Sequence, residues 1–252
     1  MIRTTVDGPV TRVTIARAER KNAFDADLIR LLTIAVRDVK AATRVVVLQS
    51  EGDTFCAGAD LEWMRGVAGF TLEENRTDSR ALADMFRALY ELEVPLVARV
   101  QGAAIGGGAG LVAVSDIAVA STEATFAFTE TRLGILPAVV SPYVVRKIGP
   151  ARATALFVTG SRIDAKRAHE IGLVERVVEP GDLDAAVGRV VDAILSAGPS
   201  AVRGAKRLVR EVEGRPPADV LDLTVERIAA IRVSDEGQEG MRAFLERRKP
   251  RW

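Results

Sequence analysis

The stretch Gln101-Gly102-Ala103-Ala104-Ile105-Gly106-Gly107-Gly108-Ala109-Gly110-Leu111 determines what fold and what kind of site this chain can form. It follows an apolar run, residues 96–100, that indicates a buried strand, and the residues after its three consecutive glycines predict a short helix. A strand that leads through glycines into a helix points unpaired backbone N–H groups at whatever lies above the helix N-terminus. Glycine allows a ligand to approach the main chain closely. The stretch therefore predicts a site for an anion or a developing oxyanion.

Strands and helices alternate on both sides of this stretch. Residues 1–15 indicate a hairpin, and residues 45–48 indicate a strand that is buried on both faces. A helix is expected over residues 72–92, before the glycines, and a strand over residues 117–120, after them. This alternation predicts the α/β class, with an antiparallel edge at the N-terminal end of the chain.

Beyond Pro180 the pattern changes, because apolar residues recur at helical spacing without intervening strands. We expect helices over residues 183–195, 202–212, 220–231 and 237–248. The chain is accordingly divided into a core, residues 1–195, and a helical C-terminal region, residues 196–252.

The composition argues against several classes of function. Thirty-five Lys and Arg against 34 Asp and Glu give a formal charge of +1, which provides no overall field for nucleic acid or an anionic membrane. One cysteine, Cys56, and one histidine, His169, are too few for an internal disulfide or an ordinary zinc or copper site. No signal-peptide core and no charge-free span of ~20 residues is found. We expect a soluble, cytoplasmic protein with no metal, no nucleic-acid partner and no membrane partner.

A second loop also follows a buried strand, and its sequence is Thr54-Phe55-Cys56-Ala57-Gly58-Ala59-Asp60-Leu61. Its side chains are small at the positions where a larger one would crowd a ligand. One N–H from each loop could together hold a carbonyl oxygen as it becomes an enolate. Such chemistry needs an acid or base, and Glu130, in a largely apolar run, is the candidate. Burial would raise its pKa above about 4.3. The alternative is a surface carboxylate paired with Arg132.

Two nucleotide-binding interpretations of the glycine stretch are weaker. A dinucleotide loop needs Gly-x-Gly-x-x-Gly in register and an acidic residue after the following strand, and the register here is poor. A triphosphate-binding loop needs Gly-Lys followed by Ser or Thr, and no lysine lies near. The first interpretation is disfavoured and the second is dropped.

Five blocks of sequence together resemble the enoyl-CoA hydratase/isomerase (crotonase) superfamily, over essentially the whole chain. They are residues 19–24 (Glu-Arg-Lys-Asn-Ala-Phe), 55–61, 101–111, 129–137 and 165–174. The resemblance implies a spiral of ββα turns, which carries the site within residues 1–195. It also implies that the helical region, residues 196–252, serves for oligomerisation and for covering the site, in a homotrimer or a dimer of trimers. It also implies an acyl-CoA thioester as substrate, and no cofactor apart from the coenzyme A of that substrate.

The resemblance implies roles for individual residues as well. The backbone N–H groups of Ala59 and Gly107 match the family's oxyanion hole, and Glu130 matches one of the two glutamates that the hydratases use. The residues implied to contact CoA or the acyl group are Ala23, Ala57, Gly58, Asp60, Leu61, Gly106, Gly108 and Gly110.

Gly110 is the main departure from the family, because it stands where the pattern Gly-Gly-Gly-x-Glu-Leu has the other glutamate. Two carboxylates jointly activate a water, whereas one suffices to move a proton between carbons. Gly110 taken alone therefore favours double-bond isomerisation. Because the surrounding motifs resemble a subgroup of hydratases, we predict hydration of a 2-enoyl-CoA, with double-bond isomerisation as the alternative and a non-catalytic acyl-CoA-binding protein as an alternative of another class.

The motifs around Gly110, Glu130 and Tyr143 are most similar to bacterial methylglutaconyl-CoA hydratase-like members. A branched or glutaconyl-type thioester is therefore expected. Its own second carboxylate would order the water in the room that Gly110 leaves.

Several other residues offer weaker hypotheses. His169, Cys56, Asp60 and Asp116 are interpreted as structural, in helix caps, turns or packing. The basic residues Lys206, Arg207 and Arg210 and the terminal residues 247–252 could contact the CoA phosphates, although such runs usually form a solvated face. Arg132 and Arg146 are possible partners for a substrate carboxylate, and Trp63 and Met64 could line an acyl pocket.

Overall fold

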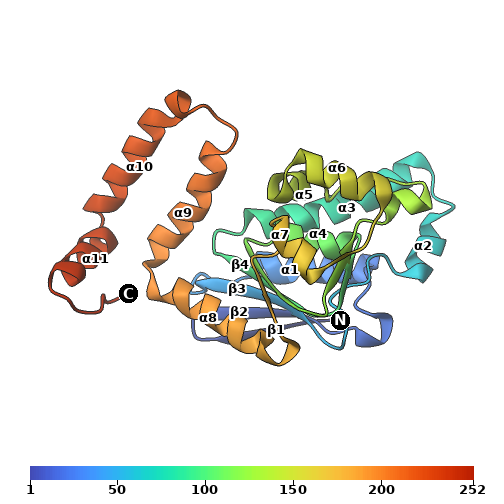
Figure 1. The fold of residues 1–252 in the computed structure, drawn as a ribbon, viewed down its shortest axis with the longest axis horizontal. Helices are drawn as coiled ribbons and strands as arrows, with labels where there is room; N and C mark the ends of the chain where they lie inside the picture. Colours follow the sequence, from blue (N-terminus) through green and yellow to red (C-terminus); the bar gives the residue numbers. More distant parts are fainter.

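A six-stranded sheet organises the core of the protein in the computed structural model, which describes residues 1–252 (Figure 1). The strand order is β1-β2-β3-β4-β6-β9. The β1–β2 hairpin is antiparallel and every other neighbouring pair is parallel. The bounds are β1 Ile2–Asp7, β2 Val10–Ile15, β3 Val45–Ser50, β4 Leu96–Val100, β6 Ile117–Ser121 and β9 Arg176–Val178.

Both faces of this sheet are covered. Alternate residues of β3 belong to different apolar clusters: Val46 and Leu48 pack into the large core, and Val45 and Val47 pack under α8 (Leu183–Ser196). The continuous apolar run of β3 is explained by this double burial. The other core helices are α1 Ala26–Arg37, α2 Leu61–Val67, α3 Leu72–Glu91, α4 Gly107–Val114, α5 Ser141–Ile148, α6 Pro150–Thr159 and α7 Ala165–Glu170.

A second, three-stranded sheet lies beside the first and carries the glycine stretch. It consists of β5 (Ala103–Ile105), β7 (Thr125–Ala127) and β8 (Ile163–Asp164), in which β5 and β7 are parallel. Two isolated parallel bridges, Cys56 to Ala104 and Phe24 to Ala59, tie earlier loops to this region. These short strands and bridges, which the sequence pattern did not predict, therefore bring together the loops around Phe24, Cys56 and the glycine stretch.

Helix α4, directly after the glycines, is buried along almost its whole length. Residues 108–114 are all buried, whereas an amphipathic surface helix would expose one face. Its N-cap, Gly106, has φ of +54°, a conformation that glycine adopts without steric cost. The predicted sequence of strand, glycine turn and apolar helix is confirmed.

The C-terminal helices extend away from the sheet as an arm (Figure 1). They are α9 Pro199–Val212, α10 Leu221–Val233 and α11 Asp235–Leu245, and no strand lies among them. The α/β class with a helical C-terminal region is thus confirmed, while the division at residue 195 into separate units stays a prediction. The remaining elements are the 3₁₀ helices η1 Ala18–Arg20, η2 Glu130–Leu133, η3 Pro180–Asp182 and η4 Pro217–Val220.

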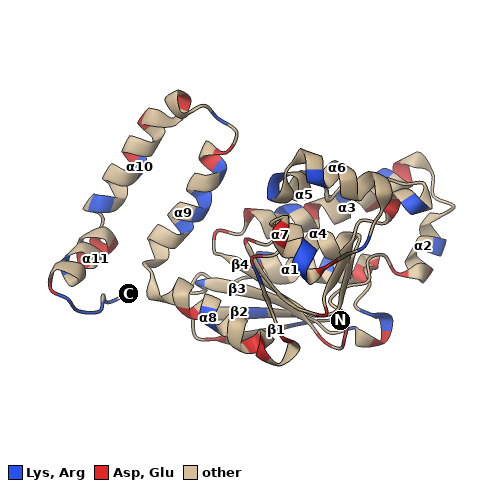
Figure 2. Cartoon of the chain, viewed as in Figure 1, with Lys and Arg blue, Asp and Glu red and all other residues tan.

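No single helix has the length and apolar composition needed to cross a membrane. Residues 180–196 and 199–212 meet that requirement only when taken together, and the chain bends by 105° between them. Both basic and acidic residues are distributed over the core and the arm (Figure 2).

Candidate active site

The loop of residues 54–60 packs directly against the glycine stretch. The N–H of Cys56 donates to the carbonyl oxygen of Ala103 at 3.0 Å, and the Cys56 carbonyl accepts from Ile105 N–H at 2.9 Å. A β-carbon on Gly108 would overlap that same Cys56 carbonyl oxygen. Glycine is required at position 108 because two backbones meet there. The predicted juxtaposition of the two loops is confirmed.

Ala59 and Gly107 each present a backbone N–H that makes no hydrogen bond within the protein. Gly107 is the first residue of α4, so its N–H has no partner within the helix. Ala59 is exposed and Gly107 is partly exposed, although both chain neighbours of each are buried. The two donors assigned to an oxyanion are therefore available to a ligand, and that assignment stays a prediction.

Phe24 contacts both loops at these positions. Its N–H donates to the Gly58 carbonyl at 2.7 Å, and its carbonyl accepts from the N–H of Asp60 at 2.8 Å, so its backbone pairs alongside Ala59. A β-carbon on Gly107 would lie 2.8 Å from Cε2 of the Phe24 ring. The backbone of this buried residue fixes the main chain at Ala59, and its ring limits the space beside Gly107. In the sequence, Phe24 is marked only as the last residue of the matching block 19–24.

Arg17 connects the segments on either side of Phe24. Its Nη2 lies 2.7 Å from Oδ2 of Asp25 and 3.2 Å from Oδ2 of Asp60, and its Nη1 donates to the Ala23 carbonyl at 2.8 Å. The Arg17 side chain is only 11% exposed and that of Asp60 only 5%. One guanidinium thus contacts both loops that are predicted to bind CoA.

Asp60 has a structural role, as predicted. Its Oδ1 accepts from the N–H of Glu62 at 2.8 Å and caps the N-terminus of α2. Burial raises the pKa of Asp60, but hydrogen bonds from Glu62 and Trp63 N–H and the charge of Arg17 outweigh it, so the pKa lies below its ordinary value. This carboxylate stays ionised and is engaged by Arg17 and by the N–H of Glu62, so it is poorly suited to transfer a proton.

The other residues assigned to CoA lie in the same two loops. Ala23 is buried, and the N–H of Ala57 donates to the Lys21 carbonyl at 3.0 Å. Gly58 has φ of +90°, and a β-carbon there would lie 2.9 Å from the Ile105 carbonyl oxygen. Leu61, at the start of α2, is 70% exposed and offers an apolar surface beside them.

Asn22 organises these loops, a structural role that was not predicted. It adopts φ of +53°, which Asn tolerates better than most residues, and it is completely buried. Its side-chain amide donates to the carbonyls of Glu51 and Thr54, at 2.7 Å each. A buried polar side chain that satisfies two backbone carbonyls fixes the turn. In the sequence, Asn22 is marked only by its place in the matching block 19–24.

Glu130 lies against the glycine turn. A β-carbon on Gly106 would lie 3.2 Å from Oε1 of Glu130, and the other oxygen, Oε2, is buried without a hydrogen-bond partner. Burial raises the pKa of Glu130 above its ordinary value, the direction that was predicted. The alternative of a surface pair with Arg132 is wrong, because the Arg132 guanidinium donates to the Thr159 carbonyl instead.

Gly110 is buried in α4 and does not open the site. A β-carbon there would overlap Cγ1 of Val140 and lie 3.0 Å from Cζ of Phe86. The expectation that Gly110 leaves room for a substrate carboxylate and a water is therefore wrong, because apolar side chains already fill that space. Glu130 remains the one predicted acid or base beside the glycine turn.

The residues interpreted as structural are placed accordingly. Cys56 is buried, and burial raises the pKa of its thiol to about 12. His169 contacts the Val174 carbonyl through Nδ1 at 3.2 Å. Asp116 accepts from Leu96 N–H at 2.7 Å. No group of three or more His, Cys, Asp or Glu side chains is arranged to hold a metal ion.

Lys206, one of the basic residues considered for the CoA phosphates, lies at the end of α4 away from the glycine turn. Lys206 donates to the Val94 carbonyl and pairs with Asp116, which precedes β6 just beyond the C-terminal end of α4. Gly107 is at the other end of that eight-residue helix, about 12 Å away at 1.5 Å per residue. Arg146 pairs with Glu213 in the arm. Trp63 packs against the large core.

Comparisons with known proteins agree with this geometry. Residues 5–252 match the family model for enoyl-CoA hydratase/isomerase. The crotonyl-CoA hydratase of Syntrophomonas wolfei is 32% identical over 239 residues, covering 93% of this chain and 91% of that protein. The short-chain-enoyl-CoA hydratase of Clostridium acetobutylicum is 31% identical over 251 residues, covering 96% and 94%.

Solved structures show the same architecture. The crystal structure of an enoyl-CoA hydratase from Shewanella pealeana matches with a TM-score of 0.95 at 38% identity, covering 100% of this chain and 95% of that chain. The predicted crotonase-like fold is thereby confirmed.

Proposed function

The chain belongs to the enoyl-CoA hydratase/isomerase family, and on that premise we propose that it hydrates a 2-enoyl-CoA through Ala59, Gly107 and Glu130. The observation that carries this proposal is the arrangement of two unpaired N–H groups in touching loops, with a half-buried carboxylate at the same glycine turn. Such donors stabilise the negative charge that develops on a thioester oxygen.

The proposed reaction needs one carboxylate in two states. Ionised Glu130 removes a proton from water as the water oxygen bonds to C3 of the substrate. The C2–C3 π electrons move towards the thioester, whose oxygen becomes the enolate held by Ala59 and Gly107 N–H. Protonated Glu130 then returns the proton to C2, which gives the 3-hydroxyacyl-CoA and restores the carboxylate. The elements of one water are added and nothing else is consumed.

A glutaconyl-type substrate, branched or not, fits a site with a single carboxylate. In this proposal the second carboxylate of the substrate orders the attacking water, a task for which a hydratase with two glutamates uses its own side chain. The environment of Gly110 offers no polar group for that task, since Val140 and Phe86 fill it. The carboxylate would have to approach from the open side of the glycine turn, where Gly107 is accessible.

Double-bond isomerisation is the second candidate, and the same packing at Gly110 favours it. In that reaction Glu130 would take a proton from one carbon of an enoyl-CoA and return it to another, with the dienolate held by the same two N–H groups. No water has to be activated, so one carboxylate is sufficient.

Labelled water separates the two candidates. The enzyme is incubated with crotonyl-CoA, 3-methylglutaconyl-CoA and a 3-enoyl-CoA in oxygen-labelled water, and the products are analysed by mass spectrometry. Hydration places the label at C3, whereas isomerisation gives unlabelled 2-enoyl-CoA. We expect labelled product, formed faster from the glutaconyl substrate. A clear preference for crotonyl-CoA would contradict the role of the substrate carboxylate, and unlabelled isomer alone would contradict hydration.

We also propose that the arm, α9–α11, assembles the protein into a homotrimer or a dimer of trimers. Apolar side chains on α10 and α11 are strongly exposed in the single chain, among them Val225 at 53%, Val233 at 78% and Phe244 at 82%. Such exposure is typical of a surface that is covered in an oligomer. Light scattering during size-exclusion chromatography tests this, and a monomeric mass for the intact protein would contradict it.

A further inference from the structure

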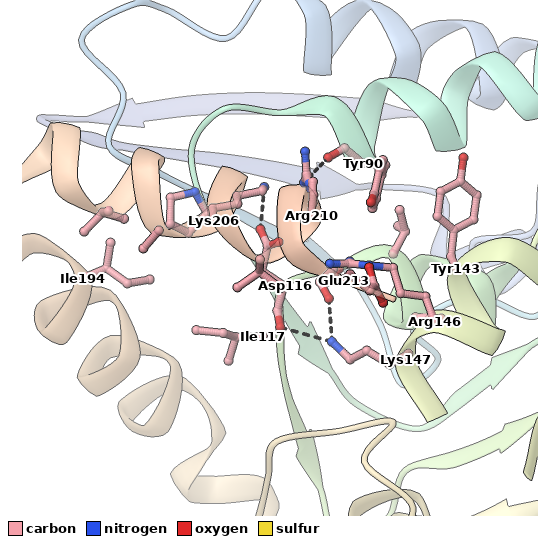
Figure 3. A pocket seen from close by; sticks show the side chains of 17 residues that line it. Tyr90, Asp116, Ile117, Tyr143, Arg146, Lys147, Ile194, Lys206, Arg210 and Glu213 are labelled. Carbon is pink, nitrogen blue, oxygen red and sulfur yellow. Dashed lines mark hydrogen bonds and ion pairs between the residues drawn. The ribbon is translucent and has the colours of Figure 1, made fainter. Parts of the chain in front are cut away.

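A cavity of about 560 Å³ lies between α9 and the core, at the C-terminal end of α4 (Figure 3). We call it the α9 cavity. Residues 113–117 form part of its wall, so it is separated from Gly107 by the length of the helix. Its volume lies in the range of sites for small molecules. It has no part in the proposed hydration.

The charges around the α9 cavity do not balance. It is lined by four basic and two acidic side chains, and basic residues recur along α9 (Figure 2). Lys206 pairs with Asp116 at 2.5 Å, and Arg146 pairs with Glu213. These two ion pairs use both carboxylates. The remaining two cations, Lys147 and Arg210, have no acidic partner.

Both of these cations are tethered to backbone carbonyls and keep further donors. The Lys147 ammonium donates to the carbonyls of Ser115 at 2.7 Å and Asp116 at 3.1 Å, which uses two of its three N–H groups. The Arg210 guanidinium donates to the Tyr90 carbonyl and lies 4.1 Å from the centroid of the Tyr90 ring. Four of its five N–H groups remain. The tethers hold both cations at the cavity wall.

Burial makes this arrangement unfavourable without an anion. Burial lowers the pKa of Lys147, Asp116 raises it, and the charge of Arg146 lowers it further, with a net downward shift. Lys206 is shifted in the same direction, again mainly by burial, with Arg210 and Arg146 among the repelling charges. An anion in the cavity would attract all four cations and offset their mutual repulsion.

Most of the rest of the wall is apolar. It includes side chains from β6, α8 and α9, namely Ile117, Ile194, Val202, Ala205 and Val209. In Figure 3, Ile117 and Ile194 lie on the side of the cavity opposite Tyr143 and Arg146. An inorganic ion would leave this surface without a partner, whereas an organic anion with a short apolar chain would contact both parts.

We propose that the α9 cavity binds a small organic anion with an apolar chain, a carboxylate or a phosphate monoester, held by Arg210 and Lys147. The anionic group contacts the free guanidinium and ammonium donors, and the chain lies against Val202 and Ile117. This site is independent of the thioester site, and its occupancy does not depend on the reaction that Glu130 performs.

Calorimetric titration of the intact protein with hexanoate and with hexyl phosphate tests the proposal, with saturating coenzyme A present so that the thioester site is occupied. We expect binding of at least one of the two, and the stronger one identifies the anionic group. Hexanol, which has the chain without the charge, should bind at least tenfold more weakly. Absence of binding by both anions would overturn the proposal.

Variants locate the binding. Arg210→Gln and Lys147→Gln each remove one positive charge from the cavity wall and keep a polar side chain there. Each should weaken binding at least tenfold. Arg207→Gln is the matched control, because Arg207 is on the same helix, 65% exposed and 4.0 Å from Glu211, outside the cavity lining. Equal binding by Arg210→Gln and Arg207→Gln would place the ligand elsewhere and overturn the proposal.

Discussion

Gly110 packs against Val140 so closely that a β-carbon on Gly110 would overlap Cγ1 of Val140 and lie 3.0 Å from its Cβ. This contact leaves no space for a side chain at residue 110, beside the one carboxylate of Glu130 at the glycine turn. The position at which the family pattern has a glutamate is closed here by the loop that leads into α5. The departure from the family motif therefore involves residue 140 as well as residue 110.

We expect Gly110→Ala to destabilise the protein by about 1–3 kcal/mol, the usual effect of overpacking. The gain in helix propensity, about 1 kcal/mol, opposes this but is smaller than the steric cost. Urea unfolding measures the change. Val140→Ala in the same chain should recover part of the loss by removing Cγ1. A double variant no more stable than Gly110→Ala would show that Val140 is not the obstacle.

Introducing the family's glutamate at this position should not improve hydration. Gly110→Glu would force a carboxylate between Val140 and Phe86, an apolar environment in which a charge is costly. We expect lower soluble yield and no rise in crotonyl-CoA turnover per folded molecule. A clear rise would mean that α4 and the following loop rearrange readily.

Glu130→Gln should lower kcat by about 10²–10⁴, the contribution typical of general acid–base catalysis, with little change in KM. The amide is nearly isosteric but cannot take up the proton. Steady-state kinetics on the best substrate of the panel measures the effect. Glu123→Gln, at an exposed turn position of the same region, is the control and should leave kcat unchanged. Full activity in Glu130→Gln would show that the base was assigned wrongly.

The pH profile should report the raised pKa of Glu130. The reaction begins with the ionised carboxylate, so activity is lost as pH falls through the pKa of Glu130. Because burial raises that pKa above the ordinary value of 4.5, the acid limb of kcat/KM should lie at higher pH than an exposed glutamate would give. A limb at or below the ordinary value would contradict the burial argument.

Arg17→Met should destabilise the protein by about 3 kcal/mol, because it leaves the buried carboxylate of Asp60 without its cation. Binding of coenzyme A should weaken as well, since the loops of Ala23 and Ala57 lose their common contact. Arg20→Met is the matched control. Arg20 pairs with Glu62 at the surface, with both side chains about half exposed, and its loss should change stability by less than about 1 kcal/mol. Similar losses in both variants would contradict the role of Arg17.

Cys56 should be unreactive in the folded protein. Its thiol is buried and, with a pKa of about 12, stays protonated at pH 8. A thiol reagent added at that pH should modify it only in denaturant. Since the chain has one cysteine, the assay has a single site. Rapid modification of the native protein would show that the loop beside Ala59 opens.

The sequence by itself determined the class of fold, the two small-residue loops and Glu130. These depend on local properties: the spacing of apolar residues, the freedom of glycine, and motifs whose residues are close along the chain. The direction of the Glu130 pKa shift also followed, because the flanking residues are mostly apolar. The helices of the arm were predictable for the same reason.

Only the tertiary structure decided what surrounds each of these residues. Phe24 and Arg17 control the loops of Ala59 through contacts with residues about 35 to 43 positions away in the chain, and no local pattern marks such a pair. The expectation that Gly110 leaves room for a ligand was wrong for the same reason. Whether a glycine borders empty space or a packed side chain depends on its neighbours in the fold, and Gly110 packs against Val140, thirty positions further along the chain. Packing between side chains that are far apart in the sequence determines which space in the site is empty. It therefore determines that residue 110 has no space for the side chain of a second glutamate.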